Sequence, residues 1–432
     1  MSRSPPPPFP ITGVALATRH ALGWMCAANA AGLWLAACLV WPRAGELAGT
    51  FTYGRWVPVH LNAHLYGWSS LPLVALLLAA FFPHRLRDNW SRYAVTAWSA
   101  ALAFACASWL TGHTSGKLFM DWTGAPRVLF PAALAVLAFA LAVGLRAGWK
   151  AWSVLNRSWR LLLLLALVPV PAILYWAASP SLYPTINPHS GGATGSSLLG
   201  STLVLIAIIL FSPTLLSIPP RAPLPRWTRI LTPLLVAHFA GYLLLERGDA
   251  SHHAADQIAG LFTLLPWPFV LVARLRLHAW PDGTRRWLLA FAAWGVVLTV
   301  SACLMFLPGA LEKSKFTNAF VAHTHMAMAG MLTSFLMIVL IALNPGGTAG
   351  ALGDPKAFRI WQAGCILHVL SMFGAGAFEA VNPGVLFGPS TVINLLYGLR
   401  LLAGLAMLDA SVRWLRAVRR ATHPHLNPNA PA

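Results

Sequence analysis

The residues best suited to chemistry are three histidines, His60, His323 and His325, each within a long apolar stretch. His323 and His325 belong to NAFVAHTHMAMAGMLTSFLMIVLIAL, residues 318–343, which is long enough to cross a bilayer. Ionisable residues inside a spanning helix are costly, which makes them functional candidates. Successive helical residues turn by about 100°, so positions two apart point to nearly opposite sides. The two imidazoles cannot hold one ion together, but each can serve a different flat cofactor.

The composition is that of a polytopic helical membrane protein. The 432 residues are 57% hydrophobic and 9% charged, and apolar segments recur to the C-terminal end. Residues 1–10 are Pro-rich and the first apolar run is long enough to span, so we expect no signal peptide. All five cysteines fall in predicted spans, and no C-x-x-C-H motif for covalent haem is present.

The basic residues support an orientation in the membrane and argue against a nucleic-acid partner. Of the 30 Lys and Arg residues, 22 fall on one side of the predicted spans, 7 fall on the other, and Arg400 lies within a span. The positive-inside rule then places both termini in the cytoplasm. We expect an integral protein of the bacterial inner membrane, with the lipid bilayer as its surroundings.

The predicted fold is an all-α membrane protein with one twelve-helix domain over residues 20–415. We expect a disordered cytoplasmic tail at 1–19 and a basic cytoplasmic tail at 416–432. The spans are predicted at 20–42, 57–82, 91–112, 126–146, 158–179, 197–218, 228–247, 254–274, 286–307, 318–343, 357–380 and 391–413.

This topology predicts that three histidines share one depth near the outer surface. His60 lies about one turn into the second span, and His323 and His325 lie one to two turns into the tenth. Two histidines at equal depth on different helices can hold one haem iron from both faces. His64 follows one turn below His60, where it could bond a propionate, tune the site or simply pack.

Two further histidines lie deep in predicted spans. His238 is midway along the seventh span, with Tyr242 four residues later on the same helix face. His368 is midway along the eleventh span. A hydrogen bond to a neighbouring helix is an adequate alternative explanation for each of them. His238 and Tyr242 are nevertheless the catalytic candidates, and His238 is the candidate for a second metal.

Three short motifs resemble the catalytic subunit of heme-copper oxidases, most closely the cbb-type cytochrome c oxidases and nitric oxide reductases. VHLNAHLYGW resembles the second-helix motif, AHTHMAMAG the tenth-helix signature, and YGLRLLAGLAML the last helix. The resemblance implies that His60 and His325 are axial ligands of a low-spin haem b. It implies that His323 is the proximal ligand of a high-spin haem, and that a separate c-type cytochrome and other respiratory subunits are partners.

The chain departs from this pattern at the second metal. That family binds copper or non-haem iron with one histidine on the sixth helix and an adjacent pair on the seventh. Here residues 197–218 hold no histidine, and the pair His252–His253 falls in a predicted outer loop. The metal is absent, or uses His238 with other partners, or the boundaries near residues 240–256 differ. We expect that it is absent, which puts full oxygen reduction in doubt.

The first hypothesis is therefore a haem-binding redox protein that passes electrons to a haem-bound diatomic gas, oxygen or NO, or serves as an electron relay. It would be an oxidoreductase of the terminal oxidase or nitric oxide reductase type. A second hypothesis is a transporter or channel in which the histidines relay protons without haem. Pro169 and Pro171 could mark one broken helix of such a protein. A third is an assembly partner that has lost its cofactors, against which the retained histidines argue.

Overall fold

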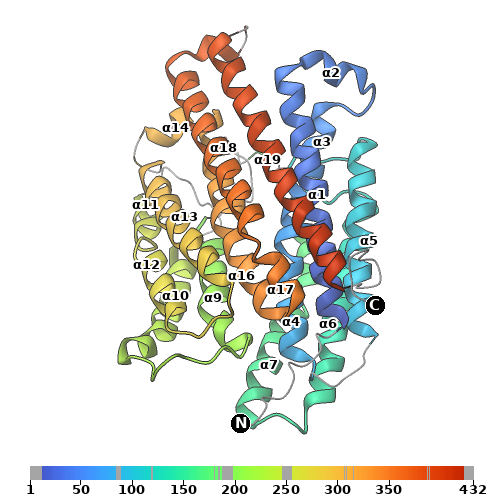
Figure 1. Cartoon of the computed structure of the whole chain (residues 1–432), viewed down its shortest axis with the longest axis vertical. Helices are drawn as coiled ribbons and strands as arrows, with labels where there is room; N and C mark the ends of the chain where they lie inside the picture. Colours follow the sequence, from blue (N-terminus) through green and yellow to red (C-terminus); the bar gives the residue numbers. More distant parts are fainter. Residues whose placement is uncertain are drawn as a thin grey trace.

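The structure is a computed structural model that describes residues 12–83, 89–117, 120–179, 181–182, 185–186, 198–245, 255–305, 307, 309–314, 316–386, 388 and 390–422. Within these ranges no β-strand occurs, and an isolated bridge joins Pro220 and His278. The predicted all-α class is confirmed. Long helices run roughly along the vertical axis of the bundle in Figure 1.

The first part of the chain forms the helices drawn in blue to green-cyan in Figure 1. Their bounds are α1 (Thr12–Val40), α2 (Pro42–Leu47), α3 (Tyr53–Asn62), η1 (Ala63–Ser69), α4 (Leu71–Phe81), α5 (Trp90–Leu110), α6 (Pro126–Gly148), α7 (Val154–Leu167) and α8 (Val170–Ala177).

The second part forms the helices drawn in green to red. Their bounds are α9 (Leu198–Leu215), η2 (Arg226–Ile230), α10 (Leu231–Leu245), α11 (Ala255–Phe262), α12 (Trp267–Arg276), α13 (Thr284–Met305), α14 (Ala310–Ser314), α15 (Asn318–His325), η3 (Met326–Leu332), α16 (Thr333–Leu343), α17 (Gly347–Leu352), α18 (Pro355–Val381), η4 (Pro383–Leu386) and α19 (Thr391–Thr422).

Ten helical segments of the described chain are long and apolar enough to cross a membrane. The sixth and seventh predicted spans correspond to α9 and α10, which are shorter. Residues 187–197 before α9 and residues 246–254 after α10 lie outside the described chain, so the structure gives only the described lengths of these two helices, 18 and 15 residues. Large apolar side chains such as Leu162, Trp176 and Leu370 face outward at 67%, 62% and 65% exposure, as lipid contact requires. The protein is an all-α membrane protein, and the count of twelve spans stays a prediction.

Helix bounds differ from the predicted spans at both ends of the chain. α1 begins at Thr12 and α19 continues to Thr422, so helix covers residues 12–19 and 416–422, which we assigned to the tails. Residues 1–11 and 423–432 lie outside the described chain. Hydropathy marks only the lipid-buried part of a helix, which explains why both helices run further. The fifth predicted span does break, between α7 and α8, next to Pro169.

Hydrogen bonds at the two ends of the bundle join helix ends that the basic residues predicted to lie on one side of the membrane. At one end of the bundle, Asn344 after α16 donates to Thr18 Oγ1 of α1 at 3.0 Å, and Arg286 of α13 bonds Gly353. At the other end, Asn318 at the start of α15 contacts Glu379 of α18 and Tyr397 of α19. Helix ends that were predicted to lie on the same side of the membrane are therefore found at the same end of the bundle.

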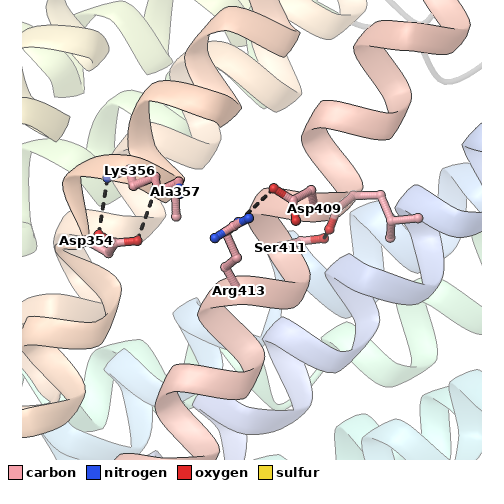
Figure 2. Close-up of polar contacts among 7 residues, drawn as sticks. Asp354, Lys356, Ala357, Asp409, Ser411 and Arg413 are labelled. Atoms are coloured by element: carbon pink, nitrogen blue, oxygen red, sulfur yellow. Dashed lines mark hydrogen bonds and ion pairs between the residues drawn. The ribbon is translucent and has the colours of Figure 1, made fainter.

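Side-chain hydrogen bonds organise the end of the bundle predicted to face the cytoplasm. Figure 2 shows Asp354, whose carboxylate accepts from the backbone N–H groups of Lys356 and Ala357 at 3.2 and 3.1 Å and so caps α18. The same view shows Arg413 paired with Asp409 one turn earlier on α19 at 2.7 Å. Both partners of this ion pair are exposed, so it adds little to stability.

One buried hydrogen bond joins the second predicted span to the tenth. Trp68 Nε1 of η1 donates to Thr333 Oγ1 of α16 at 2.9 Å, and both residues are almost inaccessible. α4 also packs against α16. This contact holds together the two helices that carry His60 and His325.

We predict that Thr333→Val lowers the free energy of unfolding by about 1–3 kcal/mol, because it leaves the Trp68 indole N–H buried without an acceptor. Thr333→Ser retains the hydroxyl and is expected to lose less than half of that amount. Thermal unfolding of the purified variants in one detergent measures both. Equal unfolding temperatures for Thr333→Val and the unaltered chain would contradict the prediction.

Candidate functional site

The site is centred on two imidazoles brought together from α3 and α15. The ring centroids of His60 and His325 lie 6.4 Å apart, and the ring planes are inclined by 21°. An imidazole nitrogen bonds a transition metal at about 2 Å and lies roughly 1.1 Å from its own ring centre. Two imidazoles on opposite sides of one metal therefore have centroids about 6.2 Å apart. The observed separation matches this value.

Both imidazoles are tied to main-chain carbonyl groups through the same ring atom. His60 Nδ1 bonds the oxygen of Ala28 on α1 at 2.8 Å, and His325 Nδ1 bonds the oxygen of Val321 at 2.8 Å. A carbonyl oxygen only accepts, so each Nδ1 carries the hydrogen. In the neutral ring Nε2 then keeps its lone pair. Metal-ligating histidines show this arrangement, in which the outer hydrogen bond sets the tautomer and the ring orientation.

A glycine on α1 makes room for the His60 ring. A Cβ atom added at Gly32 would lie 2.5 Å from His60 Cε1 and 2.8 Å from its Nδ1. No real Cβ atom tolerates such a contact, so only glycine allows α1 to approach this closely. Gly32 and the Ala28 carbonyl lie one turn apart on the same helix, which therefore both admits and orients the ring.

Each of the two histidine helices continues into a π-helical segment within one turn of its histidine. η1 begins three residues after His60, and η3 begins directly after His325. Such segments are uncommon and frequently lie at functional sites. They widen the helix and leave carbonyl groups without their usual partners.

The freed carbonyls are satisfied in the same way in both segments. In η1, Ser70 Oγ donates to Leu65 at 2.8 Å and the Trp98 indole donates to Tyr66 at 2.7 Å. In η3, the corresponding donors are Thr333 Oγ1, to Met328 at 2.8 Å, and the Trp361 indole, to Ala329 at 3.0 Å. In each case a hydroxyl five residues onward and a tryptophan from a neighbouring helix stabilise the wide turn.

His323 faces a different neighbour from His325, as the helical angle predicted. His323 Nδ1 lies 3.0 Å from Ser301 Oγ on α13. The Ser301 hydroxyl donates its hydrogen to Leu298 at 2.8 Å, so its oxygen accepts from His323 Nδ1. His323 therefore also presents Nε2 with a free lone pair. One helix thus carries two imidazoles in the same tautomer, directed to separate places.

Two more imidazoles flank the central pair. His64 meets the His60 ring edge-on with centroids 5.0 Å apart. His368 of α18 lies 4.0 Å from His325, with planes inclined by 30°. His368 is 4% exposed, and its Nε2 has no hydrogen-bond partner within the described residues. The four rings follow one another in the order His64, His60, His325 and His368.

A carboxylate fixes the start of α15. Glu379 is 2% exposed and accepts from the Asn318 backbone N–H at 2.7 Å and from Asn318 Nδ2 at 2.6 Å. A negative charge at a helix N-terminus also interacts favourably with the helix dipole. Gly376, one turn before Glu379, lets the α18 backbone lie directly against Ala319. This clamp places the helix start five residues before His323.

Arg400 of α19 brings a positive charge to the same region. Its guanidinium is close enough to interact electrostatically with His60, His325 and His368. Its Nη1 lies 3.6 Å from the sulfur of Met372, and within the described chain it forms no ion pair. A cation in this position favours an anionic group on whatever binds beside the imidazoles.

The remaining candidates are His238 and Tyr242, and within the described chain neither belongs to a cluster of metal ligands. His238 Nδ1 accepts a hydrogen bond from the Trp267 indole at 2.9 Å, and Tyr242 lies one turn later on α10. Among the described residues, no three His, Cys, Asp or Glu side chains gather as a single metal ion would require. The pair His252–His253 lies outside the described residues. A second metal at His238 gains no partner from this part of the chain.

Comparison with known proteins assigns no family to this chain. No protein-family model matches the chain, and no curated protein matches it. Likeness to the heme-copper oxidases therefore stays a resemblance in three short motifs.

Sequence reasoning brought out the histidines and missed the residues that orient them. Gly32, Ser301 and Glu379 belong to common types at unexceptional positions, and only the folded chain shows what they contact. The sequence does contain one indication of the two π-helical segments. Each contains glycine and is followed by a hydroxyl residue, Ser70 or Thr333, in an otherwise apolar helix.

We predict that Gly32→Val displaces the His60 ring and lowers the free energy of unfolding by about 1–3 kcal/mol through overpacking. Gly23→Val on the same helix is the control, because a Cβ added there meets no atom within 4 Å. Thermal unfolding of both variants measures the difference. Equal unfolding temperatures for Gly32→Val and Gly23→Val would show that α1 does not pack tightly against the His60 ring.

Proposed function

We propose that this protein is a haem-binding redox protein of the membrane, similar in its site to the heme-copper oxidase catalytic subunit. The observation that carries the proposal is the spacing of His60 and His325. Their centroids lie 6.4 Å apart, and in each ring Nδ1 donates to a carbonyl oxygen, so that the neutral ring keeps its lone pair on Nε2. This is the arrangement that two axial ligands of one haem iron require.

The chain's own groups suit a b-type haem at this position. His60 and His325 would hold the iron, and Gly32 leaves the space that the His60 ring itself occupies. Arg400 supplies a positive charge suited to the propionate carboxylates. The nearby π segments and their tryptophan donors would keep the two ligand helices fixed. A bound haem with two imidazole ligands supplies one-electron transfer at a potential that the ligands and burial set.

His323 would hold a second haem through Nε2, with Ser301 orienting its ring. The resemblance implies that this haem is high-spin, and a single imidazole leaves its opposite face open to oxygen or NO. The chain would then pass electrons from an outer donor, such as a separate c-type cytochrome, to a haem-bound gas. With the first haem alone, it would act as an electron relay. We place the protein in the bacterial inner membrane and count copper or non-haem iron as absent.

A histidine relay without haem is the second candidate function. Four imidazoles in sequence, His64, His60, His325 and His368, provide donors and acceptors within a membrane protein, as proton relays do. The Nδ1 atoms tied to carbonyl oxygens favour haem, because those ring positions cannot accept a proton from a neighbour. Haem content separates the two functions directly.

The deciding experiment is a dithionite-reduced minus air-oxidised spectrum of the purified protein, which is expected to show b-type bands. His60→Ala and His325→Ala should each remove essentially all of the low-spin signal, because one axial ligand is lost. His323→Ala should keep that signal and abolish carbon monoxide binding by a five-coordinate haem. His113→Ala in an exposed loop is the control. A normal low-spin spectrum in either of the first two variants refutes the ligand assignment.

The Ser301 hydroxyl offers a test of the His323 site alone. Ser301→Ala is expected to weaken retention of the second haem by about 10–100-fold, because removal of an outer hydrogen bond loosens a metal-ligating histidine. Thr299→Val, two residues earlier on α13, removes a hydroxyl that donates to Gly295 and is the matched control. Carbon monoxide difference spectra during haem titration report the change. Identical titrations of the two variants would show that Ser301 has no such role.

A further inference from the structure

The turn between α6 and α7 brings cations and indole rings together near the lower end of the bundle in Figure 1. Arg160 Nε donates to the Ala80 carbonyl at 2.7 Å, which places the turn beside the last residues of α4, at the end predicted to face the cytoplasm. We call residues 146–160 the basic turn. Its cations are Arg146, Lys150, Arg157 and Arg160, and its indoles belong to Trp149, Trp152 and Trp159.

Two of these indoles hold one guanidinium in place. Arg160 Cζ lies 3.9 Å from the centre of the Trp152 ring and 4.2 Å from that of the Trp159 ring. Its Nε and Nη1 donate to the carbonyl oxygens of Ala80 and Asn156 at 2.7 and 2.8 Å. Cation–π contact with indole faces adds to these bonds. Arg160 is therefore a fixed support that joins α7 to α4, and the other three cations remain to meet a ligand.

Those three cations have donors that the described chain does not engage. Arg157 Nε donates to the Trp152 carbonyl at 2.8 Å, and its Cζ lies 5.4 Å from the Trp149 ring centre. Its two terminal nitrogens make no hydrogen bond within the described residues. Arg146 and Lys150 are exposed and, in that part of the chain, form neither an ion pair nor a side-chain hydrogen bond.

The basic turn leads directly into an exposed apolar face of α7. Val154, Arg157, Leu161 and Leu165 follow one another at spacings of three and four residues, so they share one face of the helix. Val154 and Leu165 are 75% and 59% exposed. This face runs for about 16 Å along the helix and carries a guanidinium near one end. A phospholipid has a matching form, with a phosphate above an apolar chain.

The charge of the basic turn selects the kind of lipid. Residues 122–245 contain no Asp or Glu, so this stretch of the chain does not neutralise it. We propose that the basic turn binds an anionic phospholipid, with Arg146, Lys150 and Arg157 around the phosphate and one acyl chain on the apolar face of α7. The planar fork of an arginine can donate to two phosphate oxygens at once. This inference goes beyond the proposed function and does not depend on haem.

The proposal concerns this turn and not the general excess of cations on one side of the membrane. Arg285 and Lys356 are predicted to lie on the same side and are also exposed. Asp282 and Asp354 lie within three residues of them in the chain, so carboxylates accompany those cations. The positive-inside rule treats all of these cations alike. A lipid site in the basic turn makes its own cations matter more, and the other two supply a matched control.

The test is native mass spectrometry of the full-length protein, delipidated in detergent and titrated with dioleoyl phosphatidylglycerol. Each cation near an anionic lipid surface strengthens binding about fivefold. Arg146→Gln/Lys150→Gln removes two such charges and should weaken the tightest binding about 10–30-fold. Arg285→Gln/Lys356→Gln also removes two charges and should bind like the unaltered chain. Gel filtration and circular dichroism establish that each variant is folded before it is titrated.

Two further ligands test the unaltered protein. Dioleoyl phosphatidylcholine has the same chains with a zwitterionic headgroup, and glycerophosphoglycerol is the anionic headgroup without the chains. Each should bind at least about tenfold more weakly than phosphatidylglycerol, because each lacks one of the two contacts. Equal affinity for phosphatidylcholine would show that charge is not recognised, and equal affinity for glycerophosphoglycerol would show a site for soluble anions. Either result, or equal phosphatidylglycerol affinities in the two folded double variants, would overturn the proposal.

Discussion

The hydrogen bonds from two histidine Nδ1 atoms to main-chain carbonyl oxygens are the constraint on which the site depends. Side chains rotate and exchange partners, but the Ala28 and Val321 carbonyls belong to helices packed in the bundle. They fix both the ring orientation and the nitrogen that keeps its lone pair. The 6.4 Å separation of the two ring centroids suits a shared metal only because each neutral ring keeps its lone pair on Nε2.

Much of the surrounding structure serves to maintain that constraint. The π segments η1 and η3 follow the two histidines, and each has its free carbonyls satisfied by one hydroxyl and one tryptophan. Trp68 and Thr333 then join the segments directly. Because polar groups left unpaired in the bilayer cost several kcal/mol, these donors allow irregular helices to persist there.

The sequence could predict the helices, their alternation and the opposite directions of His323 and His325, because hydropathy, basic residues and helical rotation are local properties. It placed His60 and His325 at one depth. It could not predict that Gly32 would admit one ring or that His368 would lie 4.0 Å from the other. Those features depend on which helices pack together, and no residue type marks that choice.

The central claim is that His60 and His325 ligate one haem iron. Near-infrared magnetic circular dichroism of the oxidised, purified protein tests it most directly, because the charge-transfer band of a low-spin haem reports its two axial ligands. The account predicts a band at the energy of two imidazole ligands. A purified, folded protein without haem, or with a band that reports any other ligand pair, would contradict it.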